Sequence, residues 1–235
     1  MTEEAFARRV TMLGALADPV RRALYRFVAD QPGAVSREQA ADGVDVPRHK
    51  AKFHLDRLVE EGLLVPEFRR LTGRSGPGAG RPAKLYRRVR KEVSVSVPSR
   101  RYDLAGRVLA DAVERSLGGV PIDEAVQQAA VDAAEALVAE AGSRAGADDL
   151  DAVARALSPL GYEPRVAEAE LVLGNCPFDR LAADHTPVVC GMNRTFVGAV
   201  VDRVGGPNLS TAPHRAAHHC CVRVSRERTD SGDAP

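Results

Sequence analysis

A series of helix-starting and helix-ending signals in the first ninety residues constrains the fold of this chain more than any other feature. Asp18-Pro19 pairs a capping residue with a proline suited to the first helical turn, so it predicts the start of a second helix after "EEAFARRVTMLGAL". Pro32-Gly33 ends that helix, and Ser36 predicts the cap of a third, short one. A fourth helix covers "PRHKAKFHLDRLVEEGLL" and ends near Gly62, which suits a left-handed position.

Two basic segments follow these helices and are predicted to pair as a hairpin. "LLVPEFRR" and "KLYRRVRK" read as short strands joined by "LTGRSGPGAGRPA". The glycine-rich connection lacks the Gly-Lys-Ser/Thr ending of a nucleotide loop and leads into a strand, which argues against phosphate cradling. Three helices, an exposed fourth helix and a basic hairpin are the order of a winged helix-turn-helix.

The fourth helix has one apolar side and one basic side. Ala51, Leu55, Leu58 and Val59 share a stripe that can pack, whereas the basic residues on the other side concentrate in its first half. That end suits phosphates and base edges, and arginines of the hairpin suit a narrow minor groove. The residues predicted to contact DNA are Arg48, His49, Lys50, Lys52, Phe53 and Arg57 of the helix and Arg69, Arg70, Arg74, Arg81 and Lys84 of the hairpin.

Charge is divided along the chain although its net value is only +1. Residues 1–101 hold 21 Lys and Arg against 12 Asp and Glu, a net of +9, and residues 102–235 hold 12 against 20, a net of −8. A basic half that can face an anionic polymer is therefore joined to an acidic half that cannot.

The middle of the chain predicts helices and no chemistry. "YDLAGRVLADAVERSL" and "IDEAVQQAAVDAAEALVAEAG" carry modest apolar stripes, and "DDLDAVARALSPLGYEP" predicts another capped helix. No catalytic constellation is visible, so we expect no enzyme activity. A DNA reader gains from two-fold symmetry that matches a palindrome, which favours these helices as a homodimer contact.

The chain contains no membrane signal in its sequence. It has no run of about 18 apolar residues, and its first residues, "MTEEAFARRV", are acidic where a signal peptide is basic. We therefore expect a cytoplasmic protein that does not bind membranes. Because that compartment keeps thiols reduced, clustered cysteines there indicate a metal, cluster or redox site rather than a disulfide framework.

All four cysteines lie in the last sixty residues. Cys176 is predicted just beyond a strand in "AEAELVLGNCPF", and Cys190 in the first turns of a helix that begins near Thr186, where the helix dipole favours a thiolate. Cys220 and Cys221 precede a final strand, "VRV", whose alternation predicts sulfurs on opposite faces. Their spacing does not match the Cys-x-x-Cys knuckles of structural zinc.

Three alternatives to a bound metal remain open for these cysteines. Each could be a small buried apolar side chain, two could form a regulatory disulfide, or the neighbouring histidines could belong to a polar loop alone. Positions at strand ends, helix starts and loops beside Gly, Pro and His are nevertheless typical of ligands.

The first ninety residues also resemble a known family. "ALADPVRRALYRFV", "HLDRLVEEGLL" and "GRPAKLYR" are similar to ArsR-type winged-helix regulators over about residues 8–90. The resemblance implies a recognition helix over 47–61 and a wing over 69–84. No cysteine precedes Cys176, so the metal ligands that some ArsR proteins carry inside the winged helix are not evident.

The C-terminal motifs resemble a second, related family. "NCPF", "HTPVVCGM" and "CCV" look like the C-terminal region of SufR-type iron-sulfur repressors, which sense cluster supply and control cluster-assembly genes. The resemblance implies an iron-sulfur cluster, [4Fe-4S] rather than [2Fe-2S], with zinc as the alternative. The implied metal ligands are Cys176, Cys190, Cys220 and Cys221, with Cys220 preferred over Cys221. A further iron ligand could be His185, His218, His219, Cys221 or a small molecule.

Together these features predict an α+β protein of three parts and a tail. They are a winged helix-turn-helix over 1–98, a helical dimerisation region over 99–160, a cysteine-rich sensor over 161–225 and a disordered tail over 226–235. The predicted function is a dimeric transcriptional repressor that binds a palindromic operator in double-stranded DNA and senses cluster status. The alternatives are a zinc- or thiol-redox-sensing ArsR-like regulator, or a metal-containing enzyme that keeps a winged helix for protein contacts.

Overall fold

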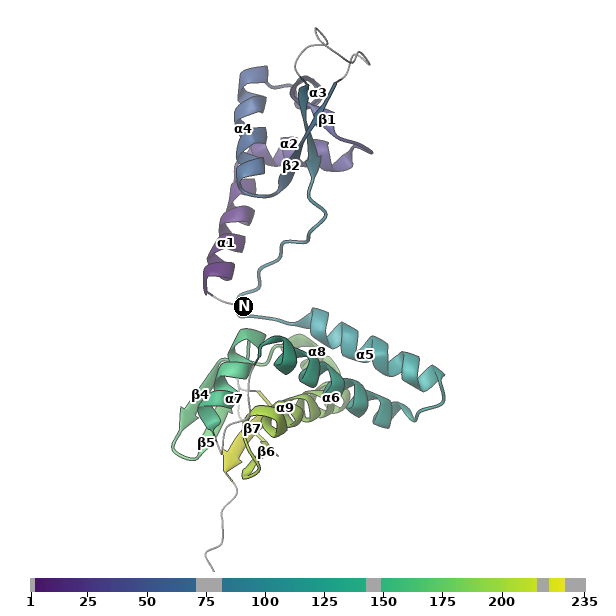
Figure 1. Cartoon of the computed structure of the whole chain (residues 1–235), viewed down its shortest axis with the longest axis vertical. Coiled ribbons are helices and arrows are strands. Elements are labelled where there is room, and N and C mark those ends of the chain that lie inside the picture. Colours follow the sequence, from purple (N-terminus) through teal and green to yellow (C-terminus); the bar gives the residue numbers. More distant parts are fainter. Residues whose placement is uncertain (1–2, 71–81, 143–148, 215–219, 227–235) are drawn as a thin grey trace, which may run out of the picture. The chain divides into compact units, whose positions relative to one another are not determined.

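A computed structural model of the chain describes residues 3–70, 82–142, 149–214 and 220–226 (Figure 1). The chain divides into two compact units, residues 2–95 and residues 96–235, and each is described by itself. The structure is α+β, as predicted. Arg74 and Arg81 of the predicted wing, His218 and His219 near the last cysteines, and residues 227–235 of the tail lie outside the described residues.

The N-terminal unit contains the four predicted helices. The Asp18 carboxylate accepts from the Arg21 amide at 2.8 Å, and Ser36 and Gln39 form a reciprocal capping box. Gly62 adopts the left-handed conformation, with φ of 74°, which ends the last helix. The helices are α1 (Glu3–Gly14), α2 (Pro19–Asp30), α3 (Arg37–Val44) and α4 (Arg48–Glu60), with a 3-10 turn, η1 (Ala15–Ala17), between the first two.

A three-stranded antiparallel sheet completes this unit. The predicted hairpin consists of β2 (Leu64–Arg69) and β3 (Ala83–Arg88), which pair over their full length. A third strand, β1 (Val35–Ser36), pairs with the other edge of β3 and was not predicted, since two residues are too few to show an alternation. The core under the sheet is built from α2, α4 and β3, and Leu24, Leu55 and Leu58 are fully buried in it.

The C-terminal unit contains three long helices, of which the middle one packs against both others. The alanine-rich α6 (Ile122–Glu140) packs against both α5 (Tyr102–Leu117) and α9 (Thr186–Val204). Ala125, Ala129, Ala130 and Ala134 are buried, and their small side chains allow the helix axes to approach closely. The shorter helices are α7 (Leu150–Leu157), which Asp149 caps, η2 (Ser158–Leu160) and α8 (Asp179–Asp184).

A four-stranded antiparallel sheet lies in the same unit, in the order β4-β5-β7-β6. The single strand expected in "AEAELVLGNCPF" is shorter, because a turn with left-handed Glu168 separates two paired strands. The segment after α9 is rich in glycine and proline, a composition typical of a loop, yet it contains a strand. Burial of Leu209 and pairing with the last strand outweigh that composition. The strands are β4 (Pro164–Ala167), β5 (Glu170–Leu173), β6 (Leu209–Pro213) and β7 (Val222–Arg226).

One hydrophobic core joins these helices and strands. Residues from α5 and α6, which the sequence assigned to a dimerisation region, are buried together with residues of α7, α9 and the sheet. The outer side of α5 still exposes apolar side chains, since Val113 is 51% and Leu117 84% exposed. Within the described ranges, every helix falls short of the length and apolarity needed to cross a membrane.

Candidate nucleic-acid interface and cysteine site

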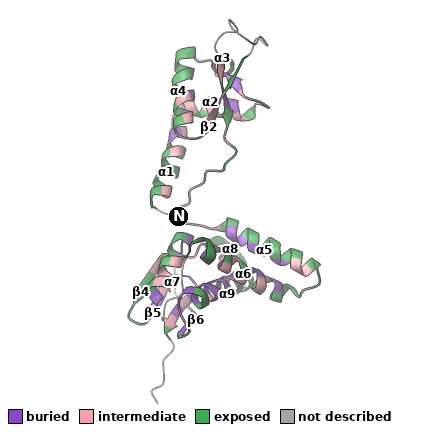
Figure 2. Cartoon of the chain, viewed as in Figure 1, coloured by how far each residue is buried: buried purple, intermediate pink, exposed green. Residues whose placement is uncertain are grey.

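Helix α4 has exposed and buried positions (Figure 2), and its residues predicted to contact DNA are exposed. Ala51, Leu55 and Leu58 are buried, whereas Arg48, His49 and Lys50 are exposed. Phe53 is 65% exposed, which is unusual for a large aromatic ring and suits contact with a thymine methyl group. The prediction for the two sides of this helix is therefore confirmed, although it missed His54, which lies on the buried side.

Asp56 on α4 gathers two of the predicted DNA contacts into an internal ion cluster. Its carboxylate accepts from Lys84 at 2.6 Å, from Lys52 at 2.9 Å and from the Tyr86 hydroxyl at 2.9 Å. Burial alone raises the pKa of Asp56, but these hydrogen bonds outweigh it and lower that pKa to about 2. Lys84 and Tyr86 therefore fix β3 to α4, whereas Lys52 pairs with Asp56 within α4. The charge of both lysines is partly balanced before any DNA arrives.

Replacing Asp56 with Ala should destabilise the N-terminal unit by about 2 kcal/mol, because the Tyr86 hydroxyl and Lys84 ammonium lose their shared acceptor. Native-state hydrogen exchange of α4 amides in the full-length chain measures this loss. Glu60→Ala is the control, since Glu60 lies on the same helix, is exposed and pairs only with Arg57 among the described ion pairs. Equal losses for the two variants would contradict the role given to Asp56.

The same cluster predicts acid sensitivity. The pKa of Asp56 is about 2 in the folded chain and about 4 when unfolded, so its stabilisation is complete above about pH 4. It should be lost as the pH falls through about 2, below which both states are protonated. Wild type should therefore lose more stability than Asp56→Ala across this interval, and parallel curves would refute the assignment.

The remaining predicted DNA contacts differ in how their charges are paired. Arg57 pairs with Glu60 at 3.2 Å and also with Glu61, both near the end of α4. Arg48 and Lys50 take part in none of the ion pairs between described residues, so their full charge faces outward. Arg69 and Arg70 are exposed where β2 leads into the wing. Arg48 and Lys50 are consequently the strongest candidates for phosphate contact.

The four cysteines come from three segments of the C-terminal unit. Cys176 follows β5, as predicted, and Cys190 lies in the first turns of α9. Cys220 and Cys221 precede β7 rather than lying in it, so strand alternation does not separate their sulfurs. The prediction that they face opposite ways is wrong for this reason: the Asn193 amide nitrogen lies 3.0 Å from Cys220 Sγ and 3.8 Å from Cys221 Sγ.

The four thiols form one chain of hydrogen-bonded neighbours. Cys176 contacts Cys220, Cys220 contacts Cys221, and Cys221 contacts Cys190. All four are free of disulfides. Among the described residues, no three His, Cys, Asp or Glu side chains already stand in the arrangement of a metal site.

The thiols differ in their readiness to ionise. Hydrogen bonding from Cys220 lowers the pKa of Cys176, and the same donor lowers that of Cys221 to about 6. Burial raises the pKa of Cys190 to about 12, and hydrogen bonds to Cys176 and Cys221 raise that of Cys220. This raised pKa contradicts the prediction, made from the helix position, that Cys190 is a thiolate; burial and the neighbouring thiol of Cys221 favour its protonated form.

A buried pair of polar residues, Tyr162 and Asn193, lies next to Cys220 and Cys221. The Tyr162 hydroxyl donates to Asn193 Oδ1 at 2.7 Å, which leaves the Asn193 amide N–H groups facing Cys220 and Cys221. Tyr162 is fully buried and Asn193 is 1% exposed. Amide donors facing sulfur stabilise the ionised form of a ligand. Nothing in the sequence marks this pair, because the hydrogen bond joins residues that are 31 positions apart.

A cavity of about 350 Å³ opens beside two of the thiols. Cys190 and Cys221 line it together with Arg194 and His214, and it gives a small molecule access to sulfur. The sequence reading overlooked His214. His185 is exposed, and among the contacts between described residues none joins it to a cysteine.

Comparison with known proteins identifies the N-terminal part. Residues 16–67 match the family model of a helix-turn-helix domain. Comparisons with curated proteins and with solved structures found no match to the chain. The matched residues contain α2, α3, α4 and the start of the hairpin. The N-terminal unit thus carries a helix-turn-helix domain, and this domain supports assignment of the chain as a DNA-binding transcription regulator.

Proposed function

We propose that this protein is a transcriptional repressor that senses iron-sulfur cluster supply through Cys176, Cys190, Cys220 and Cys221. The observation that carries the proposal is the gathering of all four thiols from three separate segments, in a chain that also holds a helix-turn-helix domain. Two explanations of this gathering need no metal, namely apolar packing and chance. Half-burial of three of the four thiols argues against apolar packing as their main role.

The residues present fit a thiolate-bound metal group. Four soft sulfur donors, an amide donor aimed at two of them and a cavity beside the other end are the donor set, the supporting contact and the access that such a group needs. The resemblance to SufR-type repressors selects an iron-sulfur cluster, with [4Fe-4S] favoured, over zinc. When bound, a cluster supplies a group that iron shortage, oxidation or nitric oxide can remove.

The sensing function requires that the site and DNA binding be linked. If the cluster-loaded protein binds its operator more tightly, DNA must in turn increase cluster retention by the same factor. We expect a homodimer on a palindromic operator, and the exposed apolar side chains Val113 and Leu117 of α5 support such pairing.

The test compares operator binding by cluster-loaded and cluster-free protein, prepared without air. Fragments bound by the loaded protein are selected from genomic DNA, and the dissociation constants of both forms are measured at matched salt. Loading should change affinity by about five- to 150-fold, the usual range of allosteric coupling. Equal affinities across a salt series would reject sensing, and absence of salt-sensitive binding to any fragment would reject the DNA-binding role.

The hydrogen-bonded thiol pairs favour a second candidate, a thiol-redox or zinc regulator. Cys176 with Cys220 and Cys190 with Cys221 are neighbours at hydrogen-bonding range. Mild oxidation of such a regulator would form a disulfide with loss of two hydrogens per pair, and mass spectrometry after alkylation detects it. A colourless protein that contains zinc, or one that cycles between dithiol and disulfide, would favour this candidate.

Replacing Arg48 or Lys50 with Ala should weaken operator binding about three- to tenfold at physiological salt and lower the salt slope by about one. Each change removes, from the exposed start of α4, one charge that takes part in no ion pair between described residues. Fluorescence anisotropy across a salt series measures both quantities, with iron content as a check that the cysteine site is unaffected. Arg107→Ala, at an exposed arginine of α5, is the control; an affinity equal to that control would remove the residue from the interface.

A further inference from the structure

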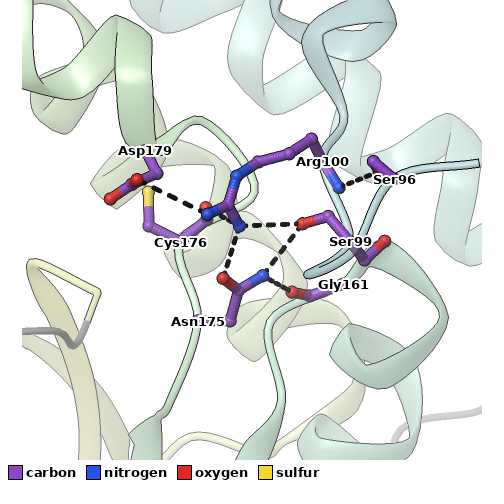
Figure 3. Close-up of polar contacts among 7 residues, drawn as sticks. All are labelled: Ser96, Ser99, Arg100, Gly161, Asn175, Cys176 and Asp179. Carbon is purple, nitrogen blue, oxygen red and sulfur yellow. Dashed lines mark hydrogen bonds and ion pairs between the residues drawn. The ribbon is translucent and has the colours of Figure 1, made fainter.

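The segment that enters the C-terminal unit is fastened to the loop that carries Cys176 (Figure 3). The Arg100 guanidinium donates to Asn175 Oδ1 at 2.5 Å and to the Cys176 carbonyl oxygen at 3.3 Å, and it pairs with Asp179 at 3.4 Å. It also donates to the Ser99 carbonyl oxygen at 3.1 Å. One side chain thus reaches three consecutive features of the loop: the residue before the cysteine, the cysteine itself and the start of α8.

Asn175 completes the attachment from the other side. Its amide nitrogen donates to the carbonyl oxygens of Ser99 at 2.9 Å and of Gly161 at 2.6 Å, and Asn175 is only 7% exposed. The Arg101 amide also donates to the Pro177 carbonyl oxygen at 3.0 Å. Residues 99–101 therefore meet residues 175–177 through both side chains and backbone, and we name the side-chain part the Arg100–Asn175 clamp.

Gly161 leaves room for the clamp. Its φ of 89° is left-handed, and a Cβ placed on it would lie 2.7 Å from Ser99 Oγ. Only glycine allows both that backbone conformation and the close approach of the Ser99 segment. The result is one closely packed junction, which we define as residues 99–101, Gly161 and residues 175–177.

Cys176 belongs to both the junction and the thiol chain. Its sulfur is hydrogen-bonded to Cys220, while its carbonyl oxygen accepts from Arg100. Asn175 and Pro177, on either side of Cys176, both contact residues 99–101, so a shift of the Cys176 backbone would reach that segment. Residue 95 is the last of the DNA-binding unit, five positions before Arg100, so the junction is close in sequence to that unit.

We propose that the Arg100–Asn175 clamp couples the state of the Cys176 thiol to DNA binding. This inference rests on the proposed function, because it names the route by which the cysteine site acts on the helix-turn-helix unit. Arginine suits this position because its planar guanidinium can donate to several acceptors at once, whereas the lysine ammonium is a single compact charge. Arg100 and Asn175 are positioning residues that act through the loop and do not bind metal.

The experiment compares wild type, Arg100→Gln and the control Arg107→Gln as full-length proteins. Arg107 is also an arginine of the C-terminal unit that pairs with an aspartate, Asp103, but its side chain is 72% exposed against 18% for Arg100. Three quantities are measured: iron and sulfide content, hydrogen exchange of residues 96–101, and the ratio of operator dissociation constants between cluster-free and cluster-loaded protein.

Arg100→Gln should keep wild-type iron and sulfide content and lose hydrogen-exchange protection in residues 96–101. Its ratio of dissociation constants between cluster-free and cluster-loaded protein should fall to within about twofold of one. Arg107→Gln should keep the wild-type ratio of at least about fivefold. A wild-type ratio in Arg100→Gln would overturn the clamp and leave the proposed function intact. A ratio of one in wild type itself would overturn both.

Arg100→Lys extends the test to a milder change that keeps the charge beside Asp179. It should retain the fold, as judged by thermal unfolding, and give a ratio between those of wild type and Arg100→Gln. If Arg100→Gln does not fold, Arg100→Lys decides: a reduced ratio supports the clamp, and an unchanged ratio rejects it.

Discussion

Cys176→Ser protein purified without air is expected to lose its visible absorption and its bound iron and sulfide. A serine hydroxyl is a hard and weakly acidic donor, whereas the thiol of Cys176 is soft and has a pKa lowered by its hydrogen bond from Cys220. Because the thiols form a chain, removing the Cys176 end also deprives buried Cys220 of a partner. Metal analysis and the absorption spectrum measure the effect.

His185→Ala is the control for this change, since His185 lies between Cys176 and Cys190 in sequence but is exposed. It should keep the wild-type spectrum. Circular dichroism should show intact helices in both variants, because the helix-turn-helix unit has its own core. Full absorption in Cys176→Ser would remove this residue from the ligand set, and loss in His185→Ala would add the histidine to it.

Asn193→Leu should destabilise the C-terminal unit by about 2–3 kcal/mol, since the fully buried Tyr162 hydroxyl loses its acceptor. Leucine has nearly the same shape as asparagine, so the change removes polar contacts and leaves little cavity. The variant also lacks the N–H donor that lies 3.0 Å from Cys220 Sγ, and bound iron should therefore be released faster to a chelator. Urea unfolding and the chelator rate measure the two effects separately.

A double substitution separates the hydrogen bond from general damage to packing. Tyr162→Phe removes the hydroxyl that Asn193→Leu leaves unsatisfied, so adding it to that variant should restore stability or leave it unchanged. In the wild-type background, Tyr162→Phe alone should instead destabilise by about 1 kcal/mol. Strictly additive losses would mean that the two residues do not interact.

The helices and hairpin of the first ninety residues were predictable because local signals agree with the tertiary structure. Asp18, Ser36 and Gly62 start and end helices by contacts within a few residues of themselves, so the sequence contains the whole cause. His54 was missed since its burial depends on how α4 packs against distant residues. The roles of Lys52 and Lys84 likewise depend on Asp56, which lies 28 residues before Lys84.

The cysteine site was predictable as a set of residues but not as an arrangement. Positions beside Gly, Pro and His mark all four thiols, and in the structure each thiol interacts with another of the four. Their role as metal ligands stays a prediction. Which thiol ionises could not be predicted, because the pKa of Cys190 and Cys221 depends on burial and on neighbouring sulfurs. Asn193, Tyr162, Arg100 and Asn175 belong to unremarkable sequence, and only the folded chain shows what they contact.

Iron and acid-labile sulfide content, measured with the absorption spectrum on protein kept from air, tests the central claim most directly. The claim predicts a brown protein with broad visible absorption, iron and sulfide in equal amounts, and loss of all three on exposure to oxygen and chelator. A colourless protein without sulfide, whether it contains zinc or no metal, would contradict it.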